Sequence, residues 1–492
     1  MLYYICYICL NAVVHIINSC LEHRVFPNAW KTAVVHPIPK KAEMVSYSDF
    51  RPISILPVLS KLLEKLVHFQ LSDYLFTHHL LPERQSGFRP LHSTTTVLAD
   101  FVDDCLRATD GGQVTLSIML DYSKAFDSLD HSMLLSKLHY VGVDRSSLLF
   151  FQSYLEGRQQ VVSLPTADGT LWSSSLSLAT GVPQGSVLGP LLFVLYMFDL
   201  PSVHLSGSLH QFADDSQIYY RFPPAQCMDV IRTVNDDLAK IVKWSMRNAL
   251  QLNSKKTIAI IFGSAHLLSS IDMDSCRILL CGDRVAFVDS CRYLGVVMDA
   301  HLSFSLHVSN LAQLAYGKLK LLFPFLRILS TKVKLRLVQA FILSSIDYCD
   351  AVYGPALSAW LQYRVQLIQN SCLRFAAGVL RRDHITPHFI AHGWIDLRHR
   401  RLLHVLTLVH KILVTGLPVY LCMKFTRRGD RHDIALRNVA DLHLPAPRSS
   451  WLARSFCYVG AKAYNLLPRH LRLRPVPAFR HHLRDWVATA QF

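Results

Sequence analysis

Two acidic signals place the strongest constraint on how this chain folds. A single aspartate, Asp121, ends the apolar run Ile118-Met119-Leu120, and a doubled aspartate follows Phe212-Ala213 as Asp214-Asp215. Residues 114–121 have the apolar content of a buried strand, which delivers Asp121 to the strand end where open α/β sites collect ligands. Carboxylates that converge from separate strands can neutralise and position two divalent cations about 4 Å apart. The pattern therefore favours a fold that brings these strands together.

The segment around the doubled aspartate has the pattern of a β-hairpin. Residues 210–213 and 217–220 read as two short strands around an Asp214-Asp215-Ser216 turn. Two aspartates in a turn are most often only a solvated turn. The glycine-rich stretch 181–190 makes a ligand site more plausible, because glycines permit close backbone approach. The apolar helix expected over 191–199 would also present its N-terminus to phosphate.

Charge divides the chain into an acidic N-terminal part and a basic C-terminal part. The net charge is +16 over 492 residues, yet residues 1–300 carry 24 Lys and Arg against 27 Asp and Glu, whereas residues 301–492 carry 27 against 8. A solvated basic surface is the simplest interpretation of such an excess. Because arginines recur beside aromatic and apolar residues after position 370, we favour a surface that binds nucleic acid.

The composition is that of a reduced globular protein. With 51% hydrophobic residues and a mean hydropathy of +0.24, the chain can bury a large core, and its length suggests about three domains. The 12 cysteines have no repeated pair spacing, so the close pair Cys6 and Cys9 does not by itself predict a zinc site or a disulfide framework. We therefore expect a protein of the nucleus or the cytoplasm.

The first 17 residues are nearly all apolar, which leaves a membrane anchor as an alternative. Asn11 and His15 interrupt this run, and no Lys or Arg precedes it as a signal peptide would require. We expect a buried helix ending near residue 24 and no stable membrane association. A second helix is predicted over about 60–75, and a third begins near residue 93 with Ser93 or Thr94 as its cap.

A series of motifs extends these signals over most of the chain in a fixed order. Three of them lie before residue 90: residues 30–40, 50–54 and 85–89. Five follow: residues 120–127, 181–190, 212–215, 252–257 and 293–295. The series resembles the reverse transcriptases of non-LTR retrotransposons of the LINE or jockey-like kind, whose fingers motifs match the first three segments and whose palm and primer-grip motifs match the rest.

The resemblance implies an α+β fold of the right-hand polymerase type, with fingers, a palm and a helical thumb, followed by a mainly helical basic C-terminal region. The corresponding divisions are residues 1–113, 114–300, 301–365 and 366–492. It also implies RNA-directed DNA polymerisation. The expected partners are an RNA template, a DNA primer and deoxynucleoside triphosphates, and the oligomeric state is left open.

The resemblance assigns the catalytic set. Two Mg²⁺ ions, or Mn²⁺ in their place, would be bound by Asp121, Asp214 and Asp215. One ion would lower the pKa of the primer 3′-hydroxyl, and the other would steady the triphosphate and the leaving pyrophosphate. Lys256 is the expected general acid for pyrophosphate, and the adjacent Lys255 is its competitor.

The expected nucleotide-binding residues come from separate motifs of the resemblance. Lys40 and Arg51 would hold the triphosphate, with Lys41 as an adjacent competitor for Lys40. Gln184 and Gly185 would contact the incoming nucleotide or the template base.

Phe126 completes the nucleotide-binding set. It lies five residues after Asp121, at the position where reverse transcriptases carry an aromatic gate against the ribose 2′-hydroxyl. RNA-dependent RNA polymerases usually place an acidic residue there, so Phe126 argues for deoxynucleotides. A phenylalanine that only packs in the core is the alternative.

Two departures from the family limit the expected function. The chain begins inside the fingers region without an upstream nuclease, and residues 301–492 contain no glutamate. We therefore do not predict cleavage of target DNA. A non-catalytic nucleic-acid-binding remnant of such an element is the alternative to a polymerase.

Overall fold

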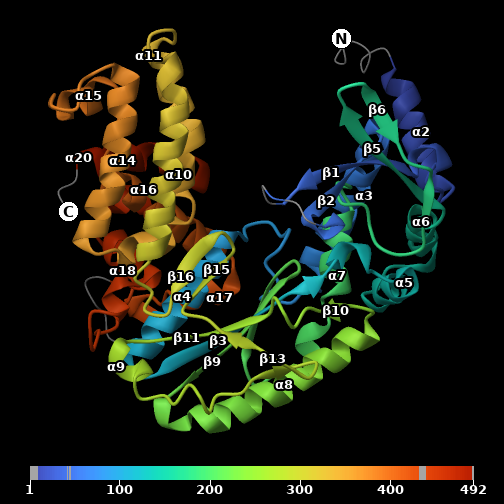
Figure 1. Cartoon of the computed structure of the whole chain (residues 1–492), viewed down its shortest axis with the longest axis horizontal. Coiled ribbons are helices and arrows are strands. Elements are labelled where there is room, and N and C mark those ends of the chain that lie inside the picture. Colours follow the sequence, from blue (N-terminus) through green and yellow to red (C-terminus); the bar gives the residue numbers. More distant parts are fainter. Residues whose placement is uncertain (1–8, 41–42, 44–45, 431–438, 490–492) are drawn as a thin grey trace.

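The computed structural model describes residues 9–40, 43, 46–430 and 439–489. Two arms extend from one central sheet (Figure 1). One arm is mixed and contains β1, β2, β5 and β6 with helices α2, α3 and α6, and the other is helical and contains α10, α11, α14 and α16. The predicted α+β class is therefore confirmed.

The central sheet has the strand order β14-β11-β3-β9-β8. Its members are β3 (Val114–Leu120), β8 (Ser208–Phe212), β9 (Asp215–Phe222), β11 (Ile258–Phe262) and β14 (Ala286–Phe287). Strand β3 lies in the middle and runs antiparallel to β9 and β11. The apolar content of β3 follows from this position, because a strand with helices on both faces has no solvent side.

Side chains of β9 alternate between two hydrophobic cores, one on each face of the sheet. Ile218 and Tyr220 join the core that contains α8 (Cys227–Arg247). Tyr219 points the other way and meets Phe101 of α4 (Thr94–Asp110) at a ring distance of 5.2 Å. This period-2 alternation is the geometry of any strand. The sheet thereby separates the core of the mixed arm from the core of the helical arm.

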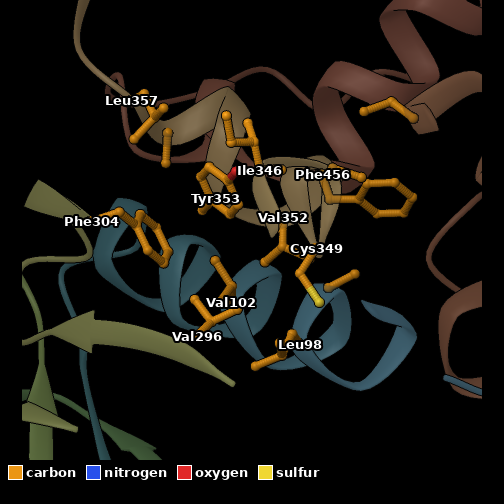
Figure 2. Packing of buried hydrophobic residues seen from close by; sticks show 14 of the residues in the cluster. Leu98, Val102, Val296, Phe304, Ile346, Cys349, Val352, Tyr353, Leu357 and Phe456 are labelled. Atoms are coloured by element: carbon orange, nitrogen blue, oxygen red, sulfur yellow. Dashed lines mark hydrogen bonds between the residues drawn. The ribbon is translucent and has the colours of Figure 1, made fainter. Parts of the chain in front are cut away.

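Helix α4 joins the sheet to the helical arm. Figure 2 shows Leu98 and Val102 of α4 near Cys349 and Val352, which come from the segment between the two long helices α10 (Ser305–Leu322) and α14 (Ala359–Ala377). The same core continues through α16 (Leu397–Thr415) and α18 (Phe456–Asn465). The C-terminal region is thus packed onto the helix that covers one face of the central sheet.

The mixed arm is built on a second sheet of order β2-β1-β5-β6, with β7 paired to β5. Its strands are β1 (Thr32–Pro39), β2 (Phe50–Ile55), β5 (Arg158–Thr166), β6 (Gly169–Trp172) and β7 (Leu176–Leu178). Pairing of β1 with β5 stops at Val35, two residues before Pro37. A proline has no N–H to give to a neighbouring strand.

The other elements are short strand pairs and helices. The pairs are β4 (Tyr122–Ser123) with β10 (Gln251–Leu252), β12 (Leu279–Leu280) with β13 (Asp283–Arg284), and β15 (Ser290–Tyr293) with β16 (Val296–Asp299). The helices are α2 (Leu10–Glu22), α3 (Val58–Thr77), α5 (His131–Tyr140), α6 (Arg145–Leu155), α7 (Gly189–Tyr196), α9 (Ala265–Leu268), α11 (Thr331–Val338), α12 (Ser344–Asp347), α13 (Asp350–Tyr353), α15 (Thr386–Ala391), α17 (Val419–Cys422), α19 (Arg469–Arg472) and α20 (Val476–Thr489).

The helices expected near residues 10–24, 60–75 and 93 correspond to α2, α3 and α4. The Ser93 side chain caps α4 by accepting a hydrogen bond from Thr96 N. In return, Ser93 N donates to the Thr96 side chain. Helix α14 continues across residue 365, where the expected thumb ends, and the four divisions stay predictions.

Two early expectations concern the N-terminus. Cys6 and the first eight residues of the apolar run lie outside the described residues. Among the helices that the structure describes, none is both long and apolar enough to span a membrane.

Candidate active site

The doubled aspartate lies at a tight hairpin between β8 and β9. Phe212 pairs with Asp215, so the turn consists of Ala213 and Asp214. The expected turn of Asp214, Asp215 and Ser216 is wrong in its position, because Asp215 and Ser216 already belong to β9 and Ala213 belongs to the turn. Ala213 adopts a positive φ of 57°, a conformation that two-residue hairpin turns commonly require.

Asp121 meets this hairpin from the neighbouring strand. The register of β3 and β9 pairs Leu120 with Ser216, which places the next residue, Asp121, beside Asp215. Two contacts with a third segment fix the Asp121 backbone. Its N–H donates to Thr257 Oγ1 at 3.3 Å, and its carbonyl accepts from Asn253 N at 2.8 Å. The structure therefore brings together the three carboxylates that the sequence singled out.

The three carboxylates disfavour one another's charge. Burial together with the Asp214 and Asp121 charges raises the pKa of Asp215 to about 6. Burial and the Asp121 charge raise the pKa of Asp214, while Arg51 acts in the opposite direction. Burial also raises the pKa of Asp121 against the influence of Lys256 and Lys40. The local environment is thus one in which an added cation would be strongly attracted.

Three expected basic residues surround these acids. Lys256 Nζ lies 3.9 Å from Asp121 Oδ2, and both side chains are open to solvent. Arg51 in β2 and Lys40 just after β1 come from the mixed arm, where the register pairs Ile38 with Arg51. Lys41, the alternative to Lys40, lies outside the described residues.

The glycine-rich loop packs against the mixed arm through its backbone. Ser54 N donates to Gln184 O at 2.7 Å. A Cβ at Gly185, whose φ is +133°, would lie 2.3 Å from Ser54 O. The Gln184 side chain donates to Asp127 Oδ1 at 3.0 Å. Its contact with a nucleotide or template base, like that of Gly185, stays a prediction.

The expectation that the helix after this loop offers its N-terminus to phosphate is wrong. The fully buried Glu64 carboxylate already accepts from Val187 N at 2.7 Å and from Leu188 N at 3.1 Å, immediately before α7. A carboxylate is stabilised at a helix N-terminus for the same reason as a phosphate. Glu64 lies 123 residues from Val187, so the local pattern of the loop could not indicate this partner.

Phe126 lies in a short 3-10 helix, Ala125–Asp127, and one face of its ring is covered. It stacks on Phe193 of α7 at a centroid distance of 4.4 Å and an interplanar angle of 18°. The residue is half-buried and Val182 N donates to its carbonyl. This packing is compatible with an aromatic gate and with a core residue, so the gate stays a prediction.

The sequence did not indicate which residues hold the hairpin turn. Gln85 Oε1 accepts from Ala213 N at 3.2 Å and from Gly87 N at 3.0 Å. Gln85 itself bridges to Gln211 of β8. A Cβ at Gly87 would lie 2.4 Å from Ala213 N. Residues 85–89, which were expected to belong to the fingers, therefore lie along β8. The one feature of the sequence that could have indicated this close approach is Gly87.

Among the described residues, the group whose ligand atoms lie close enough together to hold a metal ion is in the helical arm and does not include Asp121, Asp214 or Asp215. In the described part of the chain, the possible ligand atoms of Asp347, Asp350 and His404 lie within 4.8 Å of one another. Asp347 is already engaged by Arg400, whose Nε donates to Oδ1 at 2.6 Å. His404 Nδ1 lies 2.8 Å from Asp350 Oδ2. These contacts account for the cluster as an ion-pair network that joins α12 and α13 to α16.

Comparisons with known proteins identify relatives for most of this architecture. A family described as "Reverse transcriptase (RNA-dependent DNA polymerase)" matches residues 38–298. The chain is 30% identical to a probable RNA-directed DNA polymerase from transposon X-element of Drosophila melanogaster, over 74% of this chain and 39% of the relative. It is 28% identical to the RNA-directed DNA polymerase from mobile element jockey of the same species, over 74% and 39%.

The chain therefore spans about two fifths of the length of these relatives. Among solved structures, apo telomerase from Candida tropicalis has a TM-score of 0.41 at 12% identity, covering 80% of this chain and 63% of that chain. The resemblance to polymerases of jockey-like elements, first drawn from the motifs, is confirmed.

Proposed function

We propose that this chain, which belongs to the reverse transcriptase (RNA-dependent DNA polymerase) family, extends a DNA primer by copying an RNA template. The observation that supports this most directly is the convergence of Asp121 with Asp214 and Asp215 where β3 meets the β8–β9 hairpin. The motif order and the relatives support the same activity.

The residues present fit a site for divalent cations. Carboxylates are the hard oxygen donors that Mg²⁺ and Mn²⁺ prefer. Burial, followed by the charges of the neighbouring carboxylates, raises the pKa values of Asp214 and Asp215, and a bound cation would offset both effects. The Asp121 side chain is 40% exposed and so accessible from solvent. Two bound ions would supply charge neutralisation and an activated primer hydroxyl.

The surrounding basic residues orient the triphosphate. Arg51 and Lys40 act on the Asp214 and Asp121 carboxylates from the mixed arm, so the same cations can hold phosphate oxygens at this position. Lys256 Nζ lies 3.9 Å from Asp121 Oδ2 and can deliver a proton to the leaving pyrophosphate. Because phosphoryl transfer needs mainly positioning and charge stabilisation, this division of roles is sufficient chemically.

Phe126 selects deoxynucleotides in this proposal. Its ring is braced by Phe193 at 4.4 Å, and a braced ring excludes a 2′-hydroxyl better than a mobile one. Gln184 and Gly185 would contact the nucleotide or the template base from the adjoining loop. Residues 301–492, with 27 Lys and Arg against 8 Asp and Glu, would bind the phosphates of template and primer. Because the cysteines in the described residues are free thiols, the nucleus or the cytoplasm suits the chain.

Primer extension on poly(rA) with oligo(dT), dTTP and Mg²⁺ tests the proposal. Asp214→Asn keeps the size of the side chain and removes its charge, so incorporation should fall about a thousandfold. Asp168→Asn makes the same change at an exposed position in the turn between β5 and β6 and should leave incorporation unchanged. Chelation of divalent ions should stop incorporation by the unsubstituted chain.

Equal incorporation by the unsubstituted chain and Asp214→Asn would refute the proposal. The alternative, a nucleic-acid-binding remnant without catalysis, predicts salt-sensitive RNA binding by both proteins and incorporation by neither.

A further inference from the structure

Helix α4 carries three buried acids on one face, which we call the α4 acid cluster: Asp100, Asp103 and Asp104. Their exposed fractions are 0%, 0% and 5%. Residues at positions i, i+3 and i+4 of a helix point the same way, so the three carboxylates face one region of the interior. A buried carboxylate without a cation is strongly destabilising. The cluster therefore depends on positive partners.

The central partner is Lys424, which follows α17 in the C-terminal region. Its Nζ lies 2.8 Å from Asp100 Oδ1, 2.7 Å from Asp104 Oδ1 and 3.4 Å from Asp103 Oδ2. The same ammonium group donates to the Asp100 carbonyl at 2.8 Å. One cation supplied by a segment 320 residues further along the chain thus contacts all three carboxylates.

Tyr420 of α17 makes a second connection to the same place. Its hydroxyl donates to Thr96 Oγ1 at 3.1 Å and lies 3.0 Å from Ser86 Oγ. Its ring packs edge-on against His210 of β8, with centroids 4.8 Å apart. His210 Nε2 in turn lies 3.0 Å from Ser86 Oγ, and its Nδ1 lies 3.7 Å from Asp100. Tyr420 therefore contacts both strand β8 and the segment beside it.

That adjoining segment holds the turn that carries Asp214. Ser86 N donates to Gln211 O at 2.8 Å. The neighbouring residue Gln85 accepts from Ala213 N, one residue before Asp214. A displacement of Ser86 would therefore be transmitted to the turn through one backbone hydrogen bond and one hydrogen bond to the Gln85 side chain.

The other strand of the hairpin is tied to the acid cluster directly. Tyr219 of β9 donates to Asp104 Oδ2 at 2.7 Å and accepts from Arg84 Nη1 at 2.8 Å. Arg84 also pairs with Asp100 at 3.3 Å. Both strands of the hairpin are thus fixed to a polar network whose central cation, Lys424, belongs to the C-terminal region.

We propose that Tyr420 and Lys424 are positioning residues, through which the region after the helical thumb holds the β8–β9 hairpin in register for polymerisation. This inference rests on the proposed function and assigns a role to α17 beyond binding nucleic acid. A surface that served only to bind template would not need a hydroxyl and an ammonium group buried beneath the catalytic hairpin.

Tyr420→Phe in the full chain tests the inference, because it retains the ring and removes only the hydroxyl. Ser86 and Thr96 then lose a hydrogen-bond partner. We expect primer extension to show a kcat about tenfold lower, the size of effect that one buried hydrogen bond supports. The KM for dTTP and the affinity for RNA should stay unchanged. Tyr458→Phe, the same change on α18 of the same region, is the matched control and should leave kcat unchanged.

Hydrogen–deuterium exchange gives a readout that does not require activity. If Tyr420 positions the hairpin, the amides of residues 208–216 should exchange about tenfold faster in Tyr420→Phe than in the unsubstituted chain or in Tyr458→Phe. A purely local structural role would speed exchange only around α17. Unchanged exchange over residues 208–216 would overturn the inference, whatever happens to kcat.

The same two measurements separate this inference from the proposed function. An unsubstituted chain that incorporates no dTTP refutes the polymerase, while faster exchange in the hairpin would still sustain the link from α17. If the unsubstituted chain is active and Tyr420→Phe changes neither kcat nor hydrogen exchange in the hairpin, only the positioning role of Tyr420 is refuted. Lys424→Arg retains the positive charge and should preserve more of kcat than Lys424→Met, and equal losses would contradict the role of the ammonium charge.

Discussion

The β8–β9 hairpin contacts two groups of three aspartates, and the two groups are compensated in different ways. At the turn, Asp214 and Asp215 lie beside Asp121 and have raised pKa values, because burial and mutual repulsion disfavour their charges. Beneath the hairpin, burial also opposes ionisation of Asp100, but Lys424, His210 and Arg84 outweigh it and hold its pKa well below the usual range.

The difference between the two groups lies in where the cation comes from. Lys424 is covalently part of the chain and contacts all three carboxylates of the α4 acid cluster, to which Arg84, Arg107 and Arg221 add further positive charge. The pKa of Lys424 is raised because Asp103, Asp100 and Asp104 overcome the effect of burial. At the turn, the cations that act on the described carboxylates are Arg51, Lys40 and Lys256, and they do not overcome the effect of burial, so the pKa values of Asp121 and Asp214 stay raised and a cation from solution would be attracted. One group stabilises the fold, and the other is kept available for ligands at a cost in stability.

Removing Lys424 should produce the largest effect that this comparison predicts. Lys424→Met leaves three buried carboxylates without their common cation and should lower the free energy of unfolding by about 4 kcal/mol. Denaturant titration followed by tryptophan fluorescence would measure the loss.

Lys240→Met is the control for this prediction. Lys240 also pairs with a buried aspartate, Asp237, at 3.0 Å, but its own side chain is 44% exposed. Its removal should lower the free energy of unfolding by less than about 1 kcal/mol. If the two variants lost equal stability, the inference that Lys424 compensates the charges of the α4 acid cluster would be wrong.

A substitution at Gly87 should disturb the turn that carries Asp214 and should have an intermediate effect on the free energy of unfolding. In Gly87→Ala the new Cβ would lie 2.4 Å from Ala213 N, a backbone atom that can move only with the turn. We expect a loss of about 2 kcal/mol in the free energy of unfolding, typical of overpacking, and slower primer extension.

Gly317→Ala in α10 is the matched control, because a Cβ there meets nothing within 4 Å. Alanine in a helix should leave the stability equal or raise it by up to about 1 kcal/mol. A Gly87→Ala chain with unchanged stability and activity would show that the turn tolerates movement.

The sequence was sufficient for the parts of this architecture that depend on neighbouring residues. The apolar run before Asp121 predicted β3, the alternation around Asp214 predicted a hairpin, and Ser93 predicted the start of α4, because each pattern reflects its own strand or helix. The turn was misplaced because whether Ser216 belongs to β9 depends on its pairing with Leu120 of another strand.

The sequence could not indicate the partners that fix the site in place. Gln85 and Ala213 are 128 residues apart, and Tyr420 and Thr96 are 324 residues apart. Lys424 is also surrounded in the sequence by apolar residues and gives no local sign of pairing with α4. Charge counts indicated that the C-terminal part is basic, and only the fold shows that one of its cations, Lys424, contacts three buried carboxylates of α4.

The smallest expected effect is the pH-dependent contribution of Asp215 to the free energy of unfolding. Its sign distinguishes the aspartates at the turn from the α4 acid cluster. A folded-state pKa of about 6, above the usual value of about 4 for Asp, means that the folded protein holds this proton more tightly than the unfolded chain. The contribution of Asp215 to stability is therefore fully present below about pH 4 and is lost as the pH rises through about 6.

In the metal-free protein, Asp215→Asn should consequently raise the free energy of unfolding at pH 8 by about 1 kcal/mol. This figure is small because, although neighbouring groups partly desolvate the carboxyl group, the residue as a whole is open to solvent, which screens its charge. The gain should disappear near pH 4, whereas Asp168→Asn should give the same small difference at both pH values. Thermal unfolding in buffers from pH 4 to pH 8 with a chelator would measure both. An Asn variant that is less stable than the unsubstituted chain at pH 8 would mean that Asp215 is compensated like Asp100, because an acid whose charge is stabilised in the fold contributes most at high pH.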